Sequence, residues 1–301
     1  MTRAASTATY RTTGVDVRGG TLHTALWGPD DPAAPTILAV HGVTASHKAW
    51  PYLAKALPDV RIIAPDLRGR GRSNALPAPY GMPAHAADLA AVLAALSTGP
   101  VVVIGHSMGA FAAVVLANLF PERVSSLVLV DGGLPLQVPA GLTDKEIVAA
   151  VLGPAAERLN ATFASREAYR MFWKQHPAFH ADWSPLVEDY VDYDLTGEEP
   201  ELRPATRYQA MADDTAELHR GASLLKALDE LAVETLVLRA PRGLFNEPAG
   251  LYAAAYLDAW AEKLPALTVR EVPYVNHYTI VMTEAGAGTV AESVRAALAL
   301  P

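Results

Sequence analysis

Apolar and polar residues follow two periods along this chain, and each change of period predicts a change of element. Short runs rich in Val, Ile and Leu indicate buried strands, whereas longer stretches with apolar residues three and four apart indicate helices. The predicted strands are residues 10–17, 21–27, 36–40, 60–64, 101–104, 124–130, 235–239 and 267–272. Helices are predicted near residues 50–57, 83–96, 249–264 and 286–298, and directly after the strand at 101–104.

The order of these elements predicts the fold class and the domains. Strands that alternate with helices imply right-handed crossovers and an α/β fold, with a mostly parallel twisted sheet flanked by helices. Between residues 134 and 231 the alternation stops, and a helical pattern with several aromatic residues replaces it. We therefore expect a core domain formed by residues 1–133 and 232–301, with residues 134–231 inserted as a helical cap.

The sharpest local signal is the pentapeptide Gly105-His106-Ser107-Met108-Gly109. It joins a β-branched run to an apolar helical pattern, which is the context of a strand–turn–helix elbow. Glycine two residues before and after the serine lets the strand and the helix approach closely, and the serine is then exposed at the tip of the sheet. Ser107 is thus the candidate nucleophile.

Composition and charge narrow the classes of function. The 301 residues are 51% apolar, enough for a sizeable core, and the net charge of −8 argues against nucleic acid or an anionic membrane as a partner. The chain has no cysteine, so disulfides and thiolate chemistry are excluded. The amino-terminal residues form no apolar segment, and no run reaches the length of a membrane span. We expect a cytoplasmic protein and leave a homo-oligomer open.

Five motifs occur in an order that resembles the α/β-hydrolase-fold superfamily with a helical cap, in particular its serine esterases and lactonases. They are HGVT at 41–44, DLRGRGRS at 66–73, GHSMG at 105–109, LVLVDGG at 127–133 and VNHY at 275–278. The resemblance implies Ser107 as nucleophile, His277 as general base, and the backbone amides of Val43 and Met108 as oxyanion hole. It does not imply one substrate, because this fold hosts many activities.

The residues themselves also favour His277 as the base. A serine hydroxyl needs a base within hydrogen-bond reach, and an imidazole that titrates near pH 6.5 is the usual choice. His277 follows the last predicted strand, beside the elbow in a sheet of this order. His41 and His106 lie near the same tip, and we expect each to have a structural role or a role in orienting the site.

The third member of the triad departs from the family pattern. Most relatives carry an aspartate shortly after the strand equivalent to 235–239, but Ala240-Pro241-Arg242-Gly243 stands there. Asp131, at the end of the preceding strand, and Glu247, in a long loop, are the two alternatives. We favour Asp131, because a strand end is a better-fixed platform than a loop tip.

These residues predict hydrolysis of a carboxylic ester or lactone of an apolar small molecule, through an acyl-enzyme and without a cofactor. The wall of the substrate pocket is predicted to include His41, Phe172, Trp173 and Trp183. No metal site is expected, because Pro177 disfavours a helix through His176 and His180.

Two other functions fit the same motifs. One is hydrolysis of a carbon–carbon bond in a ring-fission product, with a carboxylate bound by Arg166, Arg170 and Lys174, which lie four residues apart. The other is a ligand-binding receptor that retains the hydrolase scaffold.

Overall fold

The fold is built on a twisted, mostly parallel sheet. The computed structural model of the chain describes residues 9–138, 141, 143, 146 and 157–299. Within them, eight strands pair in the order β1-β2-β4-β3-β5-β6-β9-β10. Their bounds are β1 Tyr10–Val17, β2 Gly20–Trp27, β3 Thr36–Val40, β4 Arg61–Pro65, β5 Val101–His106, β6 Val124–Val130, β9 Thr235–Arg239 and β10 Leu267–Glu271. The pairs β1–β2 and β2–β4 are antiparallel and the others are parallel.

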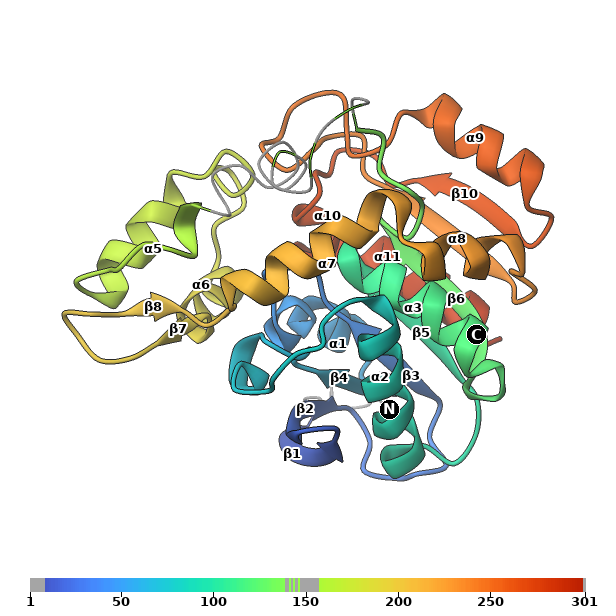
Figure 1. The fold of residues 1–301 in the computed structure, drawn as a ribbon, viewed down its shortest axis with the longest axis horizontal. Helices are drawn as coiled ribbons and strands as arrows, with labels where there is room; N and C mark the ends of the chain where they lie inside the picture. The colour runs from blue at the N-terminus through green and yellow to red at the C-terminus, as the bar shows by residue number, and fades with distance from the viewer. Residues whose placement is uncertain (1–8, 139–140, 142, 144–145, 147–156, 300–301) are drawn as a thin grey trace, which may run out of the picture.

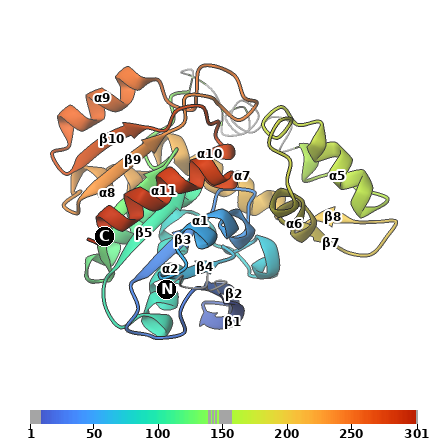
Figure 2. The ribbon, with the colours of Figure 1, turned by 180° about the vertical axis from the view of Figure 1, so that it is seen from behind.

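Helices cover both faces of this sheet, which confirms the predicted α/β class. Two hydrophobic clusters lie on its two sides. On the face toward the viewer in Figure 1 lie α2 (Met82–Leu96), α3 (Met108–Leu119), α8 (Ala222–Asp229) and α9 (Ala254–Lys263). Figure 2 shows α1 (Pro51–Ala56), the short α10 (Thr279–Met282) and α11 (Glu284–Ala297) on the other face. Central strands such as β3 and β5 are buried on both sides, which explains their continuous apolar sequences.

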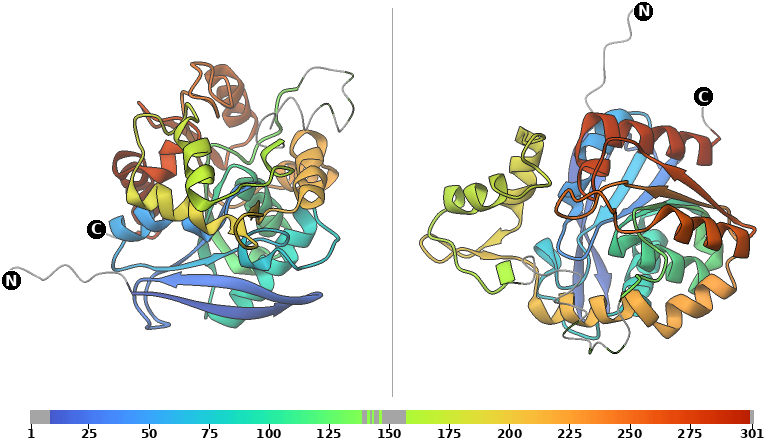
Figure 3. Two further views of the ribbon diagram at one scale, coloured as in Figure 1. Left: turned by 90° about the vertical axis from the view of Figure 1, so that its left-hand side faces the viewer. Right: turned by 90° about the horizontal axis from the view of Figure 1, so that it is seen from above.

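Part of the segment between β6 and β9 projects away from the sheet and the helices that cover it. It contains α5 (Arg166–Lys174), α6 (Pro185–Tyr193) and the two-residue strands β7 (Leu195–Thr196) and β8 (Arg203–Pro204). Figures 1 and 3 show these four elements standing out to one side of the sheet. Serine side chains cap both helices, because Ser165 accepts from the Ala168 amide and Ser184 from the Val187 amide.

A buried arginine organises the inside of this projection. The Arg158 guanidinium pairs with Asp194 and contacts the Tyr169 hydroxyl, and it lies 5.0 Å from the centre of the Trp173 ring. This paired cation and the aromatic rings around it connect α5 to the residues that follow α6, within the projection itself.

Helix α7 (Tyr208–Arg220) returns the chain from the projection to the core, as Figure 1 shows. The segment leaves and returns at neighbouring points, because the Leu136 amide donates to the Leu218 carbonyl at 2.9 Å. The limits that we predicted for the insertion, 134 and 231, stay a prediction. Among the described residues, no helix combines the length and the apolar character needed to span a bilayer.

Candidate active site

Ser107 occupies a strained turn between β5 and α3. Its φ of 54° and ψ of −127° lie outside the regions that side chains prefer, at a cost of about 1–3 kcal/mol. The turn tolerates no side chain at its glycines: a Cβ on Gly105 would lie 2.4 Å from the Gly109 carbonyl oxygen, and one on Gly109 would lie 2.1 Å from the Val40 carbonyl oxygen. This close approach is the physical reason for glycine at both positions.

His277 lies between β10 and α10, where it meets Asp131. The Nδ1 atom of His277 is 2.7 Å from Oδ2 of Asp131, which is fully buried directly after β6. The other oxygen, Oδ1, accepts from the Ala240 amide at 3.1 Å. Asp131 can thus hold the imidazole with Nδ1 protonated, which leaves Nε2 free to accept a proton.

Glu247, the other candidate acid, is directed elsewhere. Its carboxylate accepts from the Phe245 amide at 2.7 Å, and the side chain is exposed on its loop. It has no hydrogen bond to His277 among the described contacts. Of the two acids left open by the sequence, Asp131 is the one whose carboxylate lies within hydrogen-bond distance of His277 Nδ1 among the described contacts.

His106 and His41 are buried, and the side chains of both bond to backbone groups. His106 Nε2 donates to the carbonyl of His277 at 2.7 Å, and burial together with His277 lowers the pKa of His106 to about 3. His41 Nδ1 donates to the Gly42 carbonyl at 2.8 Å, while its Nε2 accepts from the Leu67 amide at 2.9 Å. Burial lowers the pKa of His41 to about 4, so both rings are neutral near pH 7.

Val43 and Met108, whose amides are the predicted oxyanion hole, belong to two segments that meet at Ser107. A Cβ on Gly42 would lie 3.1 Å from Ser107 Cβ, so the loop after β3 passes close to Ser107. Neither amide has a hydrogen-bond partner in the described part of the chain. Two unpaired donors beside a serine are suited to an oxyanion.

Ser107 and His277 open into one largely apolar cavity. Its empty space, including the mouth, is about 690 Å³. It is lined by Gly42, Val43, Thr44, Ala45, Ala49, His106, Ser107, Phe111, Leu136, Tyr190, Leu218, Leu244, Leu251, His277, Tyr278, Val281 and Met282. These residues include no Lys, Arg, Asp or Glu. The cavity therefore suits an uncharged, apolar ligand.

The pocket residues predicted from the sequence lie outside this wall, which corrects that prediction. His41 turns into the core to accept the Leu67 amide. Trp173 packs within the aromatic cluster of the projection, Phe172 is 38% exposed, and the Trp183 ring lies against Lys174. Phe172 and Trp173 lie on α5, whose aromatic side chains pack within the projection or meet solvent rather than lining the cavity.

The cations considered for a substrate carboxylate form contacts outside the cavity. Arg170 pairs with Glu188 and Asp192, Lys174 lies 3.7 Å from Glu167, and Arg166 donates to the Asp192 carbonyl at 3.2 Å. None lines the cavity.

One group with the composition of a metal site is His23, His47 and Asp66, whose ligand atoms lie within 4.8 Å of one another. The Asp66 oxygens already accept from the His47 amide, its Nδ1, the Arg72 amide and the Tyr193 hydroxyl. These bonds satisfy the carboxylate without a cation, so we assign it a structural role.

Comparison with known proteins agrees with the fold. The family model for the α/β-hydrolase fold matches residues 35–183. The chain is 43% identical to Lipase LipV of Mycobacterium tuberculosis over 131 residues, which are 44% of this chain and 48% of the lipase. It is 27% identical to 2-(acetamidomethylene)succinate hydrolase of Mesorhizobium japonicum over 251 residues, 82% of each chain.

Among solved structures, E-2-(acetamidomethylene)succinate hydrolase matches with a TM-score of 0.78 and 24% identity, over 97% of this chain and all of that one. The stretch shared with the lipase spans about half of that protein's length.

Proposed function

Since the chain belongs to the α/β-hydrolase-fold superfamily, we propose that it is a serine hydrolase that cleaves a carboxylic ester or lactone of an apolar small molecule. The observation that carries the proposal is the 2.7 Å contact between His277 and Asp131 at the wall of the cavity that Ser107 lines. The 43% identity to a lipase supports an ester as the scissile group.

In the proposed mechanism, Ser107 Oγ attacks the carbonyl carbon while His277 Nε2 takes the hydroxyl proton. The amides of Val43 and Met108 stabilise the resulting oxyanion. His277 then gives the proton to the leaving alkoxide, which departs as the alcohol and leaves an acyl-enzyme on Ser107. Water repeats the sequence and releases the carboxylic acid. Asp131 keeps the imidazole in the required tautomer and stabilises the imidazolium.

The other two functions have less support. Carbon–carbon bond hydrolysis would need a cation to bind the substrate carboxylate. The three candidates for this role lie outside the cavity wall: Arg166, Arg170 and Lys174. The receptor and the enzyme differ in the expected reactivity of Ser107: an enzyme needs an activated serine, whereas a receptor does not. A cytoplasmic location also stays a prediction.

The test is covalent labelling combined with turnover. A fluorophosphonate should label Ser107 stoichiometrically, and Ser107→Ala should abolish labelling and lower ester turnover by about 10⁴-fold, because triad members act as a unit. Ser97→Ala, at the end of α2, is the matched control and should change neither. Undiminished ester cleavage by Ser107→Ala refutes the assignment, and an unlabelled but folded wild type favours the receptor.

A further inference from the structure

Arg70, in the loop that follows β4, is fully buried although it carries a charge. Its Nε donates to the carbonyl of Val43 at 3.0 Å, and one terminal nitrogen lies 3.7 Å from the sulfur of Met108. Val43 and Met108 are the two residues whose amides form the proposed oxyanion hole. The other terminal nitrogen donates to the carbonyl of Arg68 at 2.8 Å, within the same loop.

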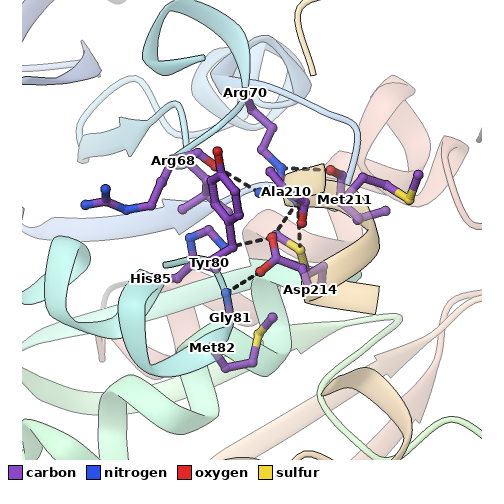
Figure 4. A network of polar contacts seen from close by, with 12 residues as sticks. Arg68, Arg70, Tyr80, Gly81, Met82, His85, Ala210, Met211 and Asp214 are labelled. Carbon is purple, nitrogen blue, oxygen red and sulfur yellow. Dashed lines mark hydrogen bonds and ion pairs between the residues drawn. The ribbon is translucent and has the colours of Figure 1, made fainter. Parts of the chain in front are cut away.

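The charge of Arg70 is balanced by Asp214, which comes from α7 in the inserted segment. The two side chains pair at 2.5 Å, and Asp214 also accepts from His85 Nε2 at 2.9 Å and from the Gly81 amide at 2.6 Å, as Figure 4 shows. Burial by itself would raise the pKa of Asp214, but Arg70 and His85 outweigh it and lower the pKa to about 2. The carboxylate is therefore ionised at neutral pH. Breaking such a buried pair by removing one partner is strongly destabilising.

The same helix face also reaches the cavity. Leu218 lies four residues after Asp214, on the same side of α7, and forms part of the cavity wall. Arg70 additionally donates to the Ala210 carbonyl at 3.3 Å, one turn before Asp214. One guanidinium thus joins the loop of the oxyanion hole to the helix that walls the cavity.

We propose that Arg70 is a positioning residue that fixes the oxyanion hole and, through Asp214, couples its geometry to the seating of α7. The inference rests on the proposed function. The carbonyl and amide of Val43 share one Cα, so holding the carbonyl limits rotation of the amide that faces the oxyanion. Catalysis by such donors depends on their being in place before the charge develops.

Arg68 provides a matched control in the same loop. It is also buried, and it binds Asp88 through Nε at 2.9 Å and through a terminal nitrogen at 2.7 Å. Its remaining described bonds go to the Pro77 and Arg18 carbonyls, away from Val43 and Met108. Loss of either arginine should destabilise the loop, but only loss of Arg70 should disturb the oxyanion hole.

The experiment compares Arg70→Lys with Arg68→Lys. Lysine keeps the positive charge beside Asp214, but its single nitrogen cannot reach both that carboxylate and the Val43 carbonyl. On an apolar p-nitrophenyl ester, kcat of Arg70→Lys should fall about 10- to 100-fold with KM within about threefold, less than the loss of a whole donor. Binding of an aryl trifluoromethyl ketone, whose adduct places an oxyanion in the hole, should weaken in parallel. Arg68→Lys should lower Tm while keeping kcat and ketone binding.

A folded Arg70→Lys with wild-type kcat and ketone affinity overturns the proposal, as does an equal loss of kcat in Arg68→Lys. If Arg70→Lys does not fold, the double variant Arg70→Gln, Asp214→Asn removes both buried charges together, and its kcat should fall likewise.

Hydrogen exchange separates this inference from the proposed function. Amides at 41–46 and 208–217 should exchange faster in Arg70→Lys than in the wild type and in Arg68→Lys. This holds even if fluorophosphonate labelling refutes the hydrolase assignment. Unchanged exchange in both stretches would also overturn the role of Arg70.

Discussion

At the scale of single residues, Asp131 combines an unusual backbone with a fixed side chain. Its φ of 46° lies in the left-handed region, which aspartate tolerates better than most residues. The Ala240 amide and the His277 ring hold its two oxygens from different elements. The Glu247 carboxylate, by contrast, is exposed and accepts from an amide of its own loop.

The first prediction concerns this acid. Asp131→Asn should preserve the shape of the site but favour the wrong tautomer of His277, and it should lower kcat by up to ~10⁴-fold. Glu247→Gln is the control and should leave kcat nearly unchanged. Steady-state kinetics on one ester measures both, and a larger loss from Glu247→Gln would move the acid to the loop.

Buried His41 gives a prediction for stability against pH. Its pKa is about 4 in the folded chain and about 6.5 when unfolded, so below pH 6.5 the unfolded state binds the extra proton. Stability from the neutral ring is therefore present near pH 7 and is lost as the pH falls toward 4. His41→Gln should cost about 2 kcal/mol more at pH 7 than at pH 4.5. Urea denaturation of both proteins at the two pH values measures this difference, and an equal cost at both would contradict it.

The site residues that could be predicted from the sequence are those that lie in short, recognisable motifs. Ser107 and His277 lie in short motifs at strand ends, and topology alone brings those ends together. Leu136, Leu218 and Leu251 line the cavity, but they are ordinary leucines whose position depends on how distant segments fold back. No local pattern distinguishes them from core residues, so the wall could not be predicted.

At the scale of elements, the close packing of α3 against β3 at the elbow can be tested by glycine-to-alanine substitutions. A Cβ on Gly109 would meet the Val40 carbonyl oxygen, whereas a Cβ on Gly288, inside α11, would meet no atom within 4 Å. Gly109→Ala should therefore cost about 3 kcal/mol, because backbone must move. Gly288→Ala should stabilise by about 0.5–1 kcal/mol, as alanine does in a helix interior. Urea denaturation compares the two, and a Gly109→Ala protein as stable as the wild type would contradict the geometry.

Strands were predicted more accurately than helix ends. β1, β3, β6 and β9 have the predicted bounds, since each is a β-branched run closed by turn residues. α9 begins at Ala254 rather than near 249, because Gly250 has a φ of 63° that a helix cannot contain. β7 and β8 are two residues each, too short to show a period in the sequence.

At the scale of the whole molecule, the cavity is walled by both parts of the chain. Leu136, Tyr190 and Leu218 come from the segment between β6 and β9, whereas Ser107 and His277 lie outside that segment. A carboxylate on the ligand would enter this space without a cation among those lining residues that the structure describes, at a desolvation cost of several kcal/mol.

We therefore expect kcat/KM for p-nitrophenyl butyrate to exceed that for mono-p-nitrophenyl succinate by at least about 10-fold, equivalent to about 1.4 kcal/mol. The two acyl chains are of equal length, so the comparison isolates the charge. Equal rates, or a preference for the succinate, would show that a cation reaches the bound acyl group.

The Leu136–Leu218 hydrogen bond has a consequence for how this chain can diversify. Because the segment between β6 and β9 leaves and returns at adjacent points, its outer part can be exchanged as a module while Ser107, Asp131 and His277 keep their places after the strand ends. The Arg70–Asp214 pair decides where the junction of a chimera should lie. A chimera that replaces residues 158–207 but retains α7 keeps both members of the buried pair. One that replaces α7 as well leaves Arg70 without its carboxylate. Selection can thus change the substrate by altering one stretch of gene, provided that the recombination point falls before Tyr208.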